Sequence, residues 1–338
     1  LFYVALAVKP ASLRRLFFPP IAIINLYLIS SRNEDVFGFA VTYFSKCSLA
    51  TNIFVASDYL LLTDVQTEFC TKKQDTPVWS RTFFERLKWG FLVVHSPRGI
   101  GWTHDTRNGA PRAQGYHREN SITRFTINQV MRLACYLALL IGVGDTWNTW
   151  FYKNYPPVRS QPWSFRPISV LGWTIPIFLS LDGSHRLLNL ILIHLRCLEP
   201  QDWVPLFGSW REGYTIRNFW GRVWHQLTRR FTLAHGEFVA LRVLRFQRRT
   251  FLFYAVRVFV AFLSSAVIHA AADYVLFGEC RGTFQFFLLQ VLAIIVETIV
   301  LRAASQSFLV HSLGFVPWKL VGYIWVLSWF SYSLPFWT

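Results

Sequence analysis

Apolar runs long enough to cross a bilayer alternate with basic stretches along this chain. A membrane-crossing helix needs about 20 mainly apolar residues, and on this pattern we expect about seven or eight membrane segments. In order, the expected segments are residues 1–8 as the end of a helix, Leu16–Ser30 interrupted at Pro19-Pro20, Val36–Leu62 as one long or two short elements, Thr126–Val143, Ile168–Leu198, Phe251–Phe277, Phe284–Leu301 and Trp318–Phe336. This is the pattern of an all-α, polytopic integral membrane protein, and with no internal repeat we expect one membrane-embedded domain over 1–338.

The segment Ile168–Leu198 is unusual because it contains Asp182, His185 and Arg186. Charged groups at membrane depth are costly, so the segment could consist of two broken or re-entrant pieces. The loops on either side indicate its sidedness. Loops 63–125 and 199–250 are rich in Lys and Arg, whereas 144–167 is poor in them. The two basic loops are therefore expected in the cytosol and 144–167 on the far side, with 168–198 crossing once.

Composition supports a membrane protein. Of 338 residues, 53% are hydrophobic and only 15% charged, which is less charge than a soluble domain carries. The net charge of +16 could suggest nucleic acid. However, the basic residues lie between apolar runs, where the positive-inside rule places them, so we expect no nucleic-acid partner. The sequence carries no signal for an oligomeric state.

The five cysteines have no short paired spacing, so neither a zinc site nor a disulfide framework is indicated. Cys47, Cys135 and Cys197 are best interpreted as small buried apolar residues. The chain opens on Leu1 and its one methionine is Met131, so we expect native residues to precede it.

The stretch YTIRNFWGRVWHQLTRRF, residues 214–231, is amphipathic if it is helical. Asn218, Arg222, His225 and Arg229 would then share one face, while Trp220, Trp224 and Leu227 would share another. A cationic stripe beside aromatic residues is typical of a helix at a membrane surface. The arginines, Arg217 among them, could bind phosphate groups or anionic lipid head groups.

His269 lies inside the apolar run Phe251–Phe277, where ionisable groups usually serve a function. On a helix, Ser265, His269 and Asp273 are i, i+4 neighbours. A carboxylate one turn away can orient an imidazole, which is the arrangement that a general base needs. The alternative is a packed core histidine with a solvated Asp273.

Asn218 and His225 each have two interpretations. Asn218 is an uncharged donor and acceptor that could polarise a carbonyl, or it could be the N-cap of a helix over 219–230. His225 could support the chemistry or be a surface histidine on an interfacial helix. A Gly-x-Ser-x-Gly elbow, a Walker loop and a His-Glu-x-x-His motif do not occur in the sequence, so no serine acyl-enzyme, nucleotide hydrolysis or metal site is indicated.

At these residues the chain resembles a known family. LFGSWREGYTIRNFWGRVWHQLTRRF followed by FLSSAVIHAAADY resembles the wax-synthase-like branch of the membrane-bound O-acyltransferases. The similarity is greatest to fungal acetyltransferases that modify terpenoid and meroterpenoid alcohols, and SPRGIGW at 96–102 resembles another segment of that branch. The resemblance covers most of the chain from about residue 58 onward.

The resemblance implies a fold and a reaction. It places the catalytic histidine of the family on His269 and its polar partner on Asn218, where plant relatives have aspartate, with His225 as a secondary candidate. It implies helices around an internal chamber, the endoplasmic reticulum, and acetyl-CoA or another acyl-CoA as co-substrate with no bound cofactor. Arg217, Arg222, Arg229 and Trp220 are then candidates for binding the acyl-CoA phosphates, and the acceptor would be a hydrophobic alcohol from the bilayer.

Two other functions remain open at this point. A long-chain wax or sterol ester synthase would use the same mechanism with a different acyl chain. A transporter could use His269 and Asp273 as a proton relay, although no repeated hydrophobic half is visible in the sequence.

Overall fold

The computed structural model describes residues 1–31, 38–71, 76–105, 121–146, 158–196, 198, 200, 203–304 and 315–337. The described backbone is helical, with one isolated β-bridge between Thr71 and Trp102, so the all-α prediction is confirmed. Four helices are long and apolar enough to cross a membrane, namely Ala11–Ser30, Ile122–Gly142, Phe251–Phe277 and Thr283–Ala304. The larger count of seven or eight segments stays a prediction.

The chain divides into two compact units, which are described separately below. Unit 1 comprises Leu1–Gly109 and Gln226–Val296, and unit 2 comprises Ala110–His225 and Glu297–Thr338. The helices of unit 1 are α1 (Phe2–Ala7), α2 (Ala11–Arg15), α3 (Phe18–Ser30), α4 (Phe39–Ser57), a π-turn (Asp58–Leu62), α5 (Val65–Glu68), a 3₁₀ turn (Val78–Ser80), α6 (Phe83–Val94), α11 (Arg229–Phe238), a second π-turn (Val239–Val243), α12 (Phe251–Phe277) and the larger part of α13 (Thr283–Ala304).

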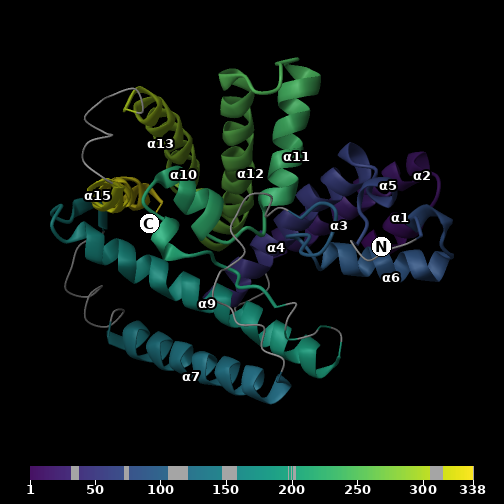
Figure 1. The fold of residues 1–338 in the computed structure, drawn as a ribbon, viewed down its shortest axis with the longest axis horizontal. Helices are drawn as coiled ribbons and strands as arrows, with labels where there is room; N and C mark the ends of the chain where they lie inside the picture. The colour runs from purple at the N-terminus through teal and green to yellow at the C-terminus, as the bar shows by residue number, and fades with distance from the viewer. Residues whose placement is uncertain are drawn as a thin grey trace. The chain divides into compact units, whose positions relative to one another are not determined.

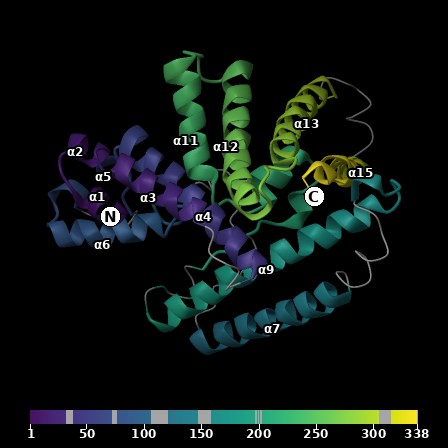
Figure 2. The same ribbon diagram turned by 180° about the vertical axis from the view of Figure 1, so that it is seen from behind.

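In unit 1, α11 and α12 pack side by side as an antiparallel pair, and α4 packs against both α3 and α12 (Figures 1 and 2). Pro19 and Pro20 do not interrupt a helix as expected. They lie in the first turn of α3, where a missing N–H leaves no hydrogen bond unmade. The segment Val36–Leu62 is one element from Phe39 onward, because α4 continues directly into the π-turn.

The expected loop 63–125 contains a regular helix, which the sequence interpretation missed. Thr82 and Glu85 form a capping box at the start of α6, each bonding the backbone N–H of the other. Trp89 and Val93 then pack into a core with residues of α1, α5 and the first π-turn. The basic residues 72, 73, 107, 112 and 118 of this loop lie outside the described residues.

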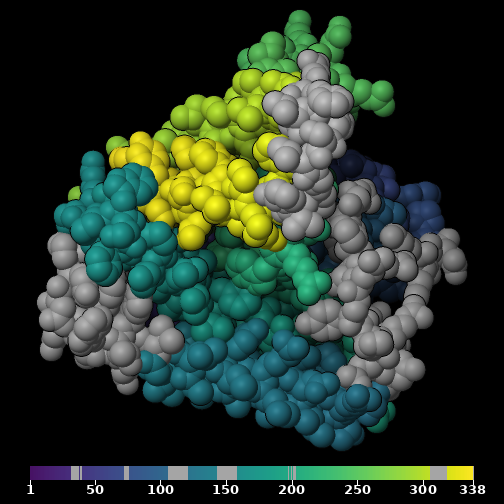
Figure 3. All heavy atoms as spheres, turned by 60° about the vertical axis from the view of Figure 1, so that its left-hand side comes forward, coloured from purple at the N-terminus to yellow at the C-terminus, as the bar shows by residue number. Residues whose placement is uncertain are grey.

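Unit 2 contains α7 (Ile122–Thr146), a 3₁₀ turn (Val158–Ser160), α9 (Arg166–His194), a 3₁₀ turn (Trp210–Glu212), α10 (Ile216–Asn218), a π-turn (Phe219–Val223), the end of α13, α15 (Phe315–Ser333) and a 3₁₀ turn (Leu334–Phe336). α7 lies alongside α9 (Figures 1 and 2), and α15 packs against α9, as the adjoining yellow and teal atoms show (Figure 3). Many apolar side chains of α7 are exposed, Met131 at 62% among them, as expected for a helix that faces lipid.

α9 is a single helix, so the expected break within Ile168–Leu198 is wrong. Asp182 and Arg186 do not need a break, because they form an ion pair one turn apart, with Nε and Oδ2 separated by 2.6 Å. From α7, Tyr136 donates to Asp182 (2.8 Å), and the Arg186 guanidinium donates to Gln129 (2.7 Å). The two charges are thus neutralised and hydrogen-bonded between two intact helices.

A second buried charge joins the first π-turn of unit 1 to α11. Asp58 is fully buried, and Arg230 Nε lies 3.4 Å from its Oδ2. Thr63 links the two, donating to Asp58 (2.6 Å) and accepting from Arg230 (2.8 Å). The guanidinium also lies over the Phe69 ring, 4.9 Å from its centroid. The exposed fraction of the Arg230 side chain is 23%, so only one member of this pair can be hydrated.

Because Asp58 is fully buried and Arg230 is partly exposed, replacing each by alanine should lower the free energy of unfolding by different amounts. Arg230→Ala leaves a carboxylate stranded without water and should lower the free energy of unfolding by about 3–5 kcal/mol. Asp58→Ala leaves an arginine that can turn toward water, and it should cost clearly less. Thermal unfolding of both variants in the same detergent is the measurement. Equal losses, or a larger loss for Asp58→Ala, would contradict the prediction.

Candidate functional site

The face of α12 that carries Ser265, His269 and Asp273 is continuous, as the spacing predicts. Thr250 caps the helix by accepting from Phe253 N (3.2 Å), and Gly278 ends it in the left-handed region at φ 78°. Between these ends the helix has no break, so the three polar side chains follow one another at single-turn intervals.

The His269 imidazole is held by residues of two other helices of unit 1. Its Nδ1 lies 2.9 Å from the hydroxyl of Tyr43 and 3.7 Å from Cys47 Sγ, both on α4. Phe287 of α13 stacks on the ring, with centroids 5.2 Å apart and planes 15° from parallel. Nδ1 is thus engaged by a hydroxyl while an aromatic face fixes the plane of the imidazole.

The two supporting residues on the same face have partners of their own. The Asp273 carboxylate is buried and accepts a hydrogen bond from the hydroxyl of Thr283, at the start of α13. The Ser265 hydroxyl donates back to the carbonyl of Ala261 (3.1 Å), as serines in helices commonly do. Asp273 was expected to orient the imidazole, and that role stays a prediction; the partners described at Nδ1 are the Tyr43 hydroxyl and Cys47 Sγ.

Tyr43 and Cys47 were not identified from the sequence. Tyr43 is 226 residues from His269, and no motif connects them. The available signal was its spacing from Cys47, because residues four apart share a helical face. Cys47 is buried, as expected, while Cys135 is exposed and Cys197 lies outside the described residues.

The stretch 214–231, which begins in unit 2 and ends in unit 1, does not form the single helix that its periodicity predicts. α10 ends at Asn218, a π-turn follows, and the backbone becomes extended at Trp224 (ψ 156°) before α11 begins at Arg229 in unit 1. The expected shared face of Asn218, Arg222, His225 and Arg229 is therefore wrong, and so is that of Trp220, Trp224 and Leu227. Contacts from α13, described next, fix the start of α10 instead.

Glu297 of α13 holds the segment that begins at Thr215. Its carboxylate accepts from the backbone N–H of Ile216 (2.8 Å) and of Arg217 (3.0 Å), and from Trp325 Nε1 (3.0 Å). The Thr215 hydroxyl accepts from Asn218 N (3.0 Å). Three backbone donors at the start of α10 are thus satisfied by side chains, and a carboxylate there is also favoured by the helix dipole.

Asn218 directly precedes the π-turn, but its side chain makes no capping hydrogen bond there, and the cap of α10 is Thr215. The Asn218 side chain is half-buried, and its carboxamide makes no hydrogen bond to the described part of the chain. Both amide hydrogens and the carbonyl oxygen remain available to another molecule.

The candidates for phosphate binding belong to both units, with Arg217, Trp220 and Arg222 in unit 2 and Arg229 in unit 1. Arg222 pairs with Glu212 (3.0 Å), and Arg229, which belongs to unit 1, donates to Gln226 (3.0 Å). Arg217 is exposed. Trp220 packs its ring against Phe219, Trp224 and Phe330, with centroid distances of 5.3, 6.1 and 5.9 Å.

His225 is not a simple surface histidine. Its ring lies between Phe207 and Trp224, and its Nδ1 is buried without a partner in the described chain. Desolvation lowers the pKa of His225 from 6.5 to about 4, so its imidazole is neutral at physiological pH. A neutral imidazole can act as a hydrogen-bond partner but not as a cationic phosphate ligand.

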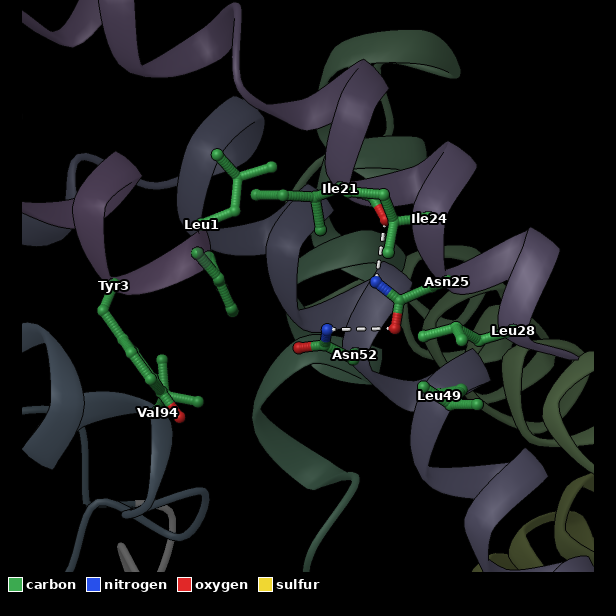
Figure 4. Close-up of a pocket in the computed structure, with 10 residues that line it drawn as sticks. Leu1, Tyr3, Ile21, Ile24, Asn25, Leu28, Leu49, Asn52 and Val94 are labelled. Atoms are coloured by element: carbon green, nitrogen blue, oxygen red, sulfur yellow. Dashed lines mark hydrogen bonds between the residues drawn. The ribbon is translucent and has the colours of Figure 1, made fainter.

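Unit 1 also contains a pocket of about 330 Å³ lined by α1, α3, α4 and the end of α6 (Figure 4). Its lining side chains are apolar except for Tyr3 and a pair of amides, in which Asn52 donates to Asn25 (3.1 Å) and Asn25 donates to the Ile21 carbonyl (2.7 Å). None of the predicted site residues lines this pocket.

Comparison with known proteins identifies the family. A model described as the membrane bound O-acyl transferase family matches residues 203–289. Acetyltransferase ple2 of Rhodocybe pseudopiperita is 30% identical over 98% of this chain and 85% of its own length. The chain belongs to the membrane bound O-acyl transferase family. It is an acyltransferase enzyme.

Further relatives agree with this membership. Acetyltransferase eriL of Hericium erinaceus is 28% identical over 96% of this acyltransferase and 84% of its own length. Acetyltransferase sirH of Emericella nidulans is 34% identical over 82% and 65% of the two chains. No solved structure matches this acyltransferase. Family membership removes the transporter alternative.

The backbone at Gly208 closely approaches the backbone of the π-turn Phe219–Val223. Gly208 N donates to Val223 O (2.9 Å), and a Cβ at Gly208 would lie 2.0 Å from the carbonyl oxygen of Arg222. The clash is with backbone, which cannot rotate away. Any side chain at Gly208 must therefore push the π-turn away from residues 207–209.

Gly208→Ala should lower the free energy of unfolding by roughly 1–3 kcal/mol, the usual range for overpacking. Gly221→Ala is the matched control, because a Cβ there meets nothing within 4 Å. Thermal unfolding of the two variants against the parent protein checks this. If Gly208→Ala were as stable as Gly221→Ala, the described approach of the two backbones would be wrong.

Proposed function

We propose that this acyltransferase transfers an acetyl group from acetyl-CoA to a hydroxyl of a hydrophobic terpenoid or meroterpenoid alcohol in the endoplasmic reticulum membrane. The proposal rests chiefly on two relatives named acetyltransferases that align over nearly the whole chain. The terpenoid class of acceptor comes from the family resemblance of the sequence blocks at 206–231 and 262–274.

His269 would act as the general base. For that role its Nε2 must carry the lone pair, so its Nδ1 must carry the proton. Tyr43 oxygen lies 2.9 Å from Nδ1 and can accept that proton's hydrogen bond, which stabilises the required tautomer. Phe287 stacking keeps the imidazole plane fixed, so Nε2 points in one direction.

The reaction would be a direct transfer. The alcohol proton passes to Nε2 of His269 as the oxygen attacks the thioester carbonyl carbon. The C–S bond then breaks, and the leaving thiolate of CoA takes the proton back from the imidazolium. The Tyr43 oxygen would stabilise the transient imidazolium through the same hydrogen bond, a role that a carboxylate has in serine hydrolases.

Asn218 would donate its amide hydrogens to the acyl carbonyl. As the negative charge develops on that oxygen, such a donor stabilises the transition state more than the ground state. The unengaged carboxamide favours this role, and the hydrogen bonds to Thr215 and Glu297 fix the backbone that carries it.

His269→Ala should reduce acetyl transfer by roughly two to four orders of magnitude, the usual contribution of a general base. Tyr43→Phe should keep the ring contacts but remove the acceptor, lowering turnover by about fivefold, since one hydrogen bond is worth about 1 kcal/mol net. Product formation with acetyl-CoA and a panel of terpenoid alcohols is the measurement.

Tyr274→Phe on α12 is a matched control for the tyrosine variant, because Tyr274 is 61% exposed. It should leave turnover unchanged. A His269→Ala enzyme with near-parental turnover would falsify the mechanism. Preference for palmitoyl-CoA over acetyl-CoA in the same assay would instead support a long-chain ester synthase with the same base.

The variant Asn218→Ala tests whether the Asn218 side chain binds the acyl carbonyl or only supports the local structure. Loss of a transition-state donor should lower turnover by roughly one hundredfold. Stability should change little, because the Asn218 side chain caps nothing in the described chain. Turnover is therefore normalised to folded protein measured by size-exclusion chromatography. A loss of stability with normal turnover per folded molecule would overturn the role.

A further inference from the structure

The turn that joins α11 to α12 carries an unusual set of exposed side chains. We define the hairpin tip as residues 239–252, VALRVLRFQRRTFL. It contains four arginines, and the sequence has no Asp or Glu between Glu237 and Asp273. Arg248 pairs with Glu237 (3.6 Å), an acid that also faces Arg257 (3.4 Å).

The other three arginines of the hairpin tip, Arg242, Arg245 and Arg249, are exposed and make no ion pair or hydrogen bond through their guanidinium groups within the described chain. They alternate with apolar side chains that are also exposed, Val243 at 59%, Leu244 at 46% and Leu252 at 55%. Neither bulk water nor hydrocarbon suits such a mixture. It fits the boundary between them, where apolar groups enter the acyl region and guanidinium groups meet phosphates.

The position of the hairpin tip agrees with that boundary. α12 is an apolar span of 27 residues, about 40 Å long, whereas the hydrocarbon core is about 30 Å thick. The helix therefore extends beyond the hydrocarbon, and its first turn, which belongs to the hairpin tip, reaches the head groups. The charge rule places this loop in the cytosol, where the leaflet carries anionic lipid.

We propose that the hairpin tip docks on the cytosolic leaflet by binding anionic phospholipid head groups through Arg242, Arg245 and Arg249. Each guanidinium can form paired hydrogen bonds to a phosphate, but the main attraction is between charges. Val243, Leu244 and Leu252 would enter the acyl region beside them. The partner is thus a lipid surface, and the proposal does not depend on which alcohol the enzyme acetylates.

Backbone amides of the hairpin tip provide a direct readout. The N–H groups of Arg245, Gln247, Arg248 and Arg249 make no hydrogen bond within the described chain, so they should exchange rapidly unless a surface covers them. The full chain is placed in nanodiscs of phosphatidylcholine, with or without phosphatidylserine, and hydrogen–deuterium exchange is followed over 239–250. We expect exchange to be severalfold slower with phosphatidylserine and the difference to disappear at high salt.

Two triple variants test the charges. Arg242→Gln, Arg245→Gln and Arg249→Gln together should abolish the difference between the two nanodiscs. The matching replacement of all three by Lys keeps the charge and should retain the difference, and it also reports whether the tip tolerates substitution. Equal exchange of the parent protein in both nanodiscs, or a persistent difference in the Gln variant, would overturn the proposal.

A further experiment tests whether the arginines bind lipid head groups or the phosphates of coenzyme A. Coenzyme A is added to the parent protein in phosphatidylcholine nanodiscs. On our proposal it leaves exchange over 239–250 unchanged. Protection by coenzyme A without any effect of phosphatidylserine would assign the arginines to the donor and overturn the lipid assignment.

Discussion

Polar groups inside an apolar helix need partners, and this requirement determines how unit 1 is built around α12. Unpaired imidazole or carboxylate groups in such surroundings would cost several kcal/mol. The helix satisfies Ser265 with its own backbone, but His269 and Asp273 need groups from elsewhere. α4 provides Tyr43 and α13 provides Thr283. Each of these helices must therefore pack against α12 with a particular rotation about its own axis and a particular position along α12. The contacts around the half-buried histidine thus follow from the need to give its ring nitrogen a partner.

Unit 2 solves a comparable problem at the start of a short helix. Three residues of α10 are too few to be stable alone, because helix nucleation is unfavourable. The carboxylate of Glu297 and the hydroxyl of Thr215 bond the free amides that such a helix exposes, and Gly208 contacts the end of the π-turn that follows it. Asn218 therefore lies on a segment whose backbone is held at several points, although the segment has little regular structure.

The sequence predicted features that depend on local patterns. The bounds of α12, the continuity of the Ser265–Asp273 face and the family all follow from short-range periodicity or motifs. The break at Trp224 could not be predicted, because the helical pattern of residues continues through it, while Glu297 and Gly208 impose another path from a distance. At Asp182 and Arg186 the sequence wrongly suggested a broken helix. Their charges look costly in isolation, and only the structure pairs them with each other and with α7.

The location of Tyr43 has a consequence for the wider family. The residues that identify an acyltransferase of this kind lie at 203–289, while the hydroxyl against the histidine comes from a helix near the other end of the chain. Selection can therefore alter the two regions independently. A descendant with phenylalanine at position 43 would still match the family model at 203–289 but would lack the hydroxyl beside His269. On the proposed mechanism, the block that marks the family and the support of its histidine are recorded in separate parts of this sequence.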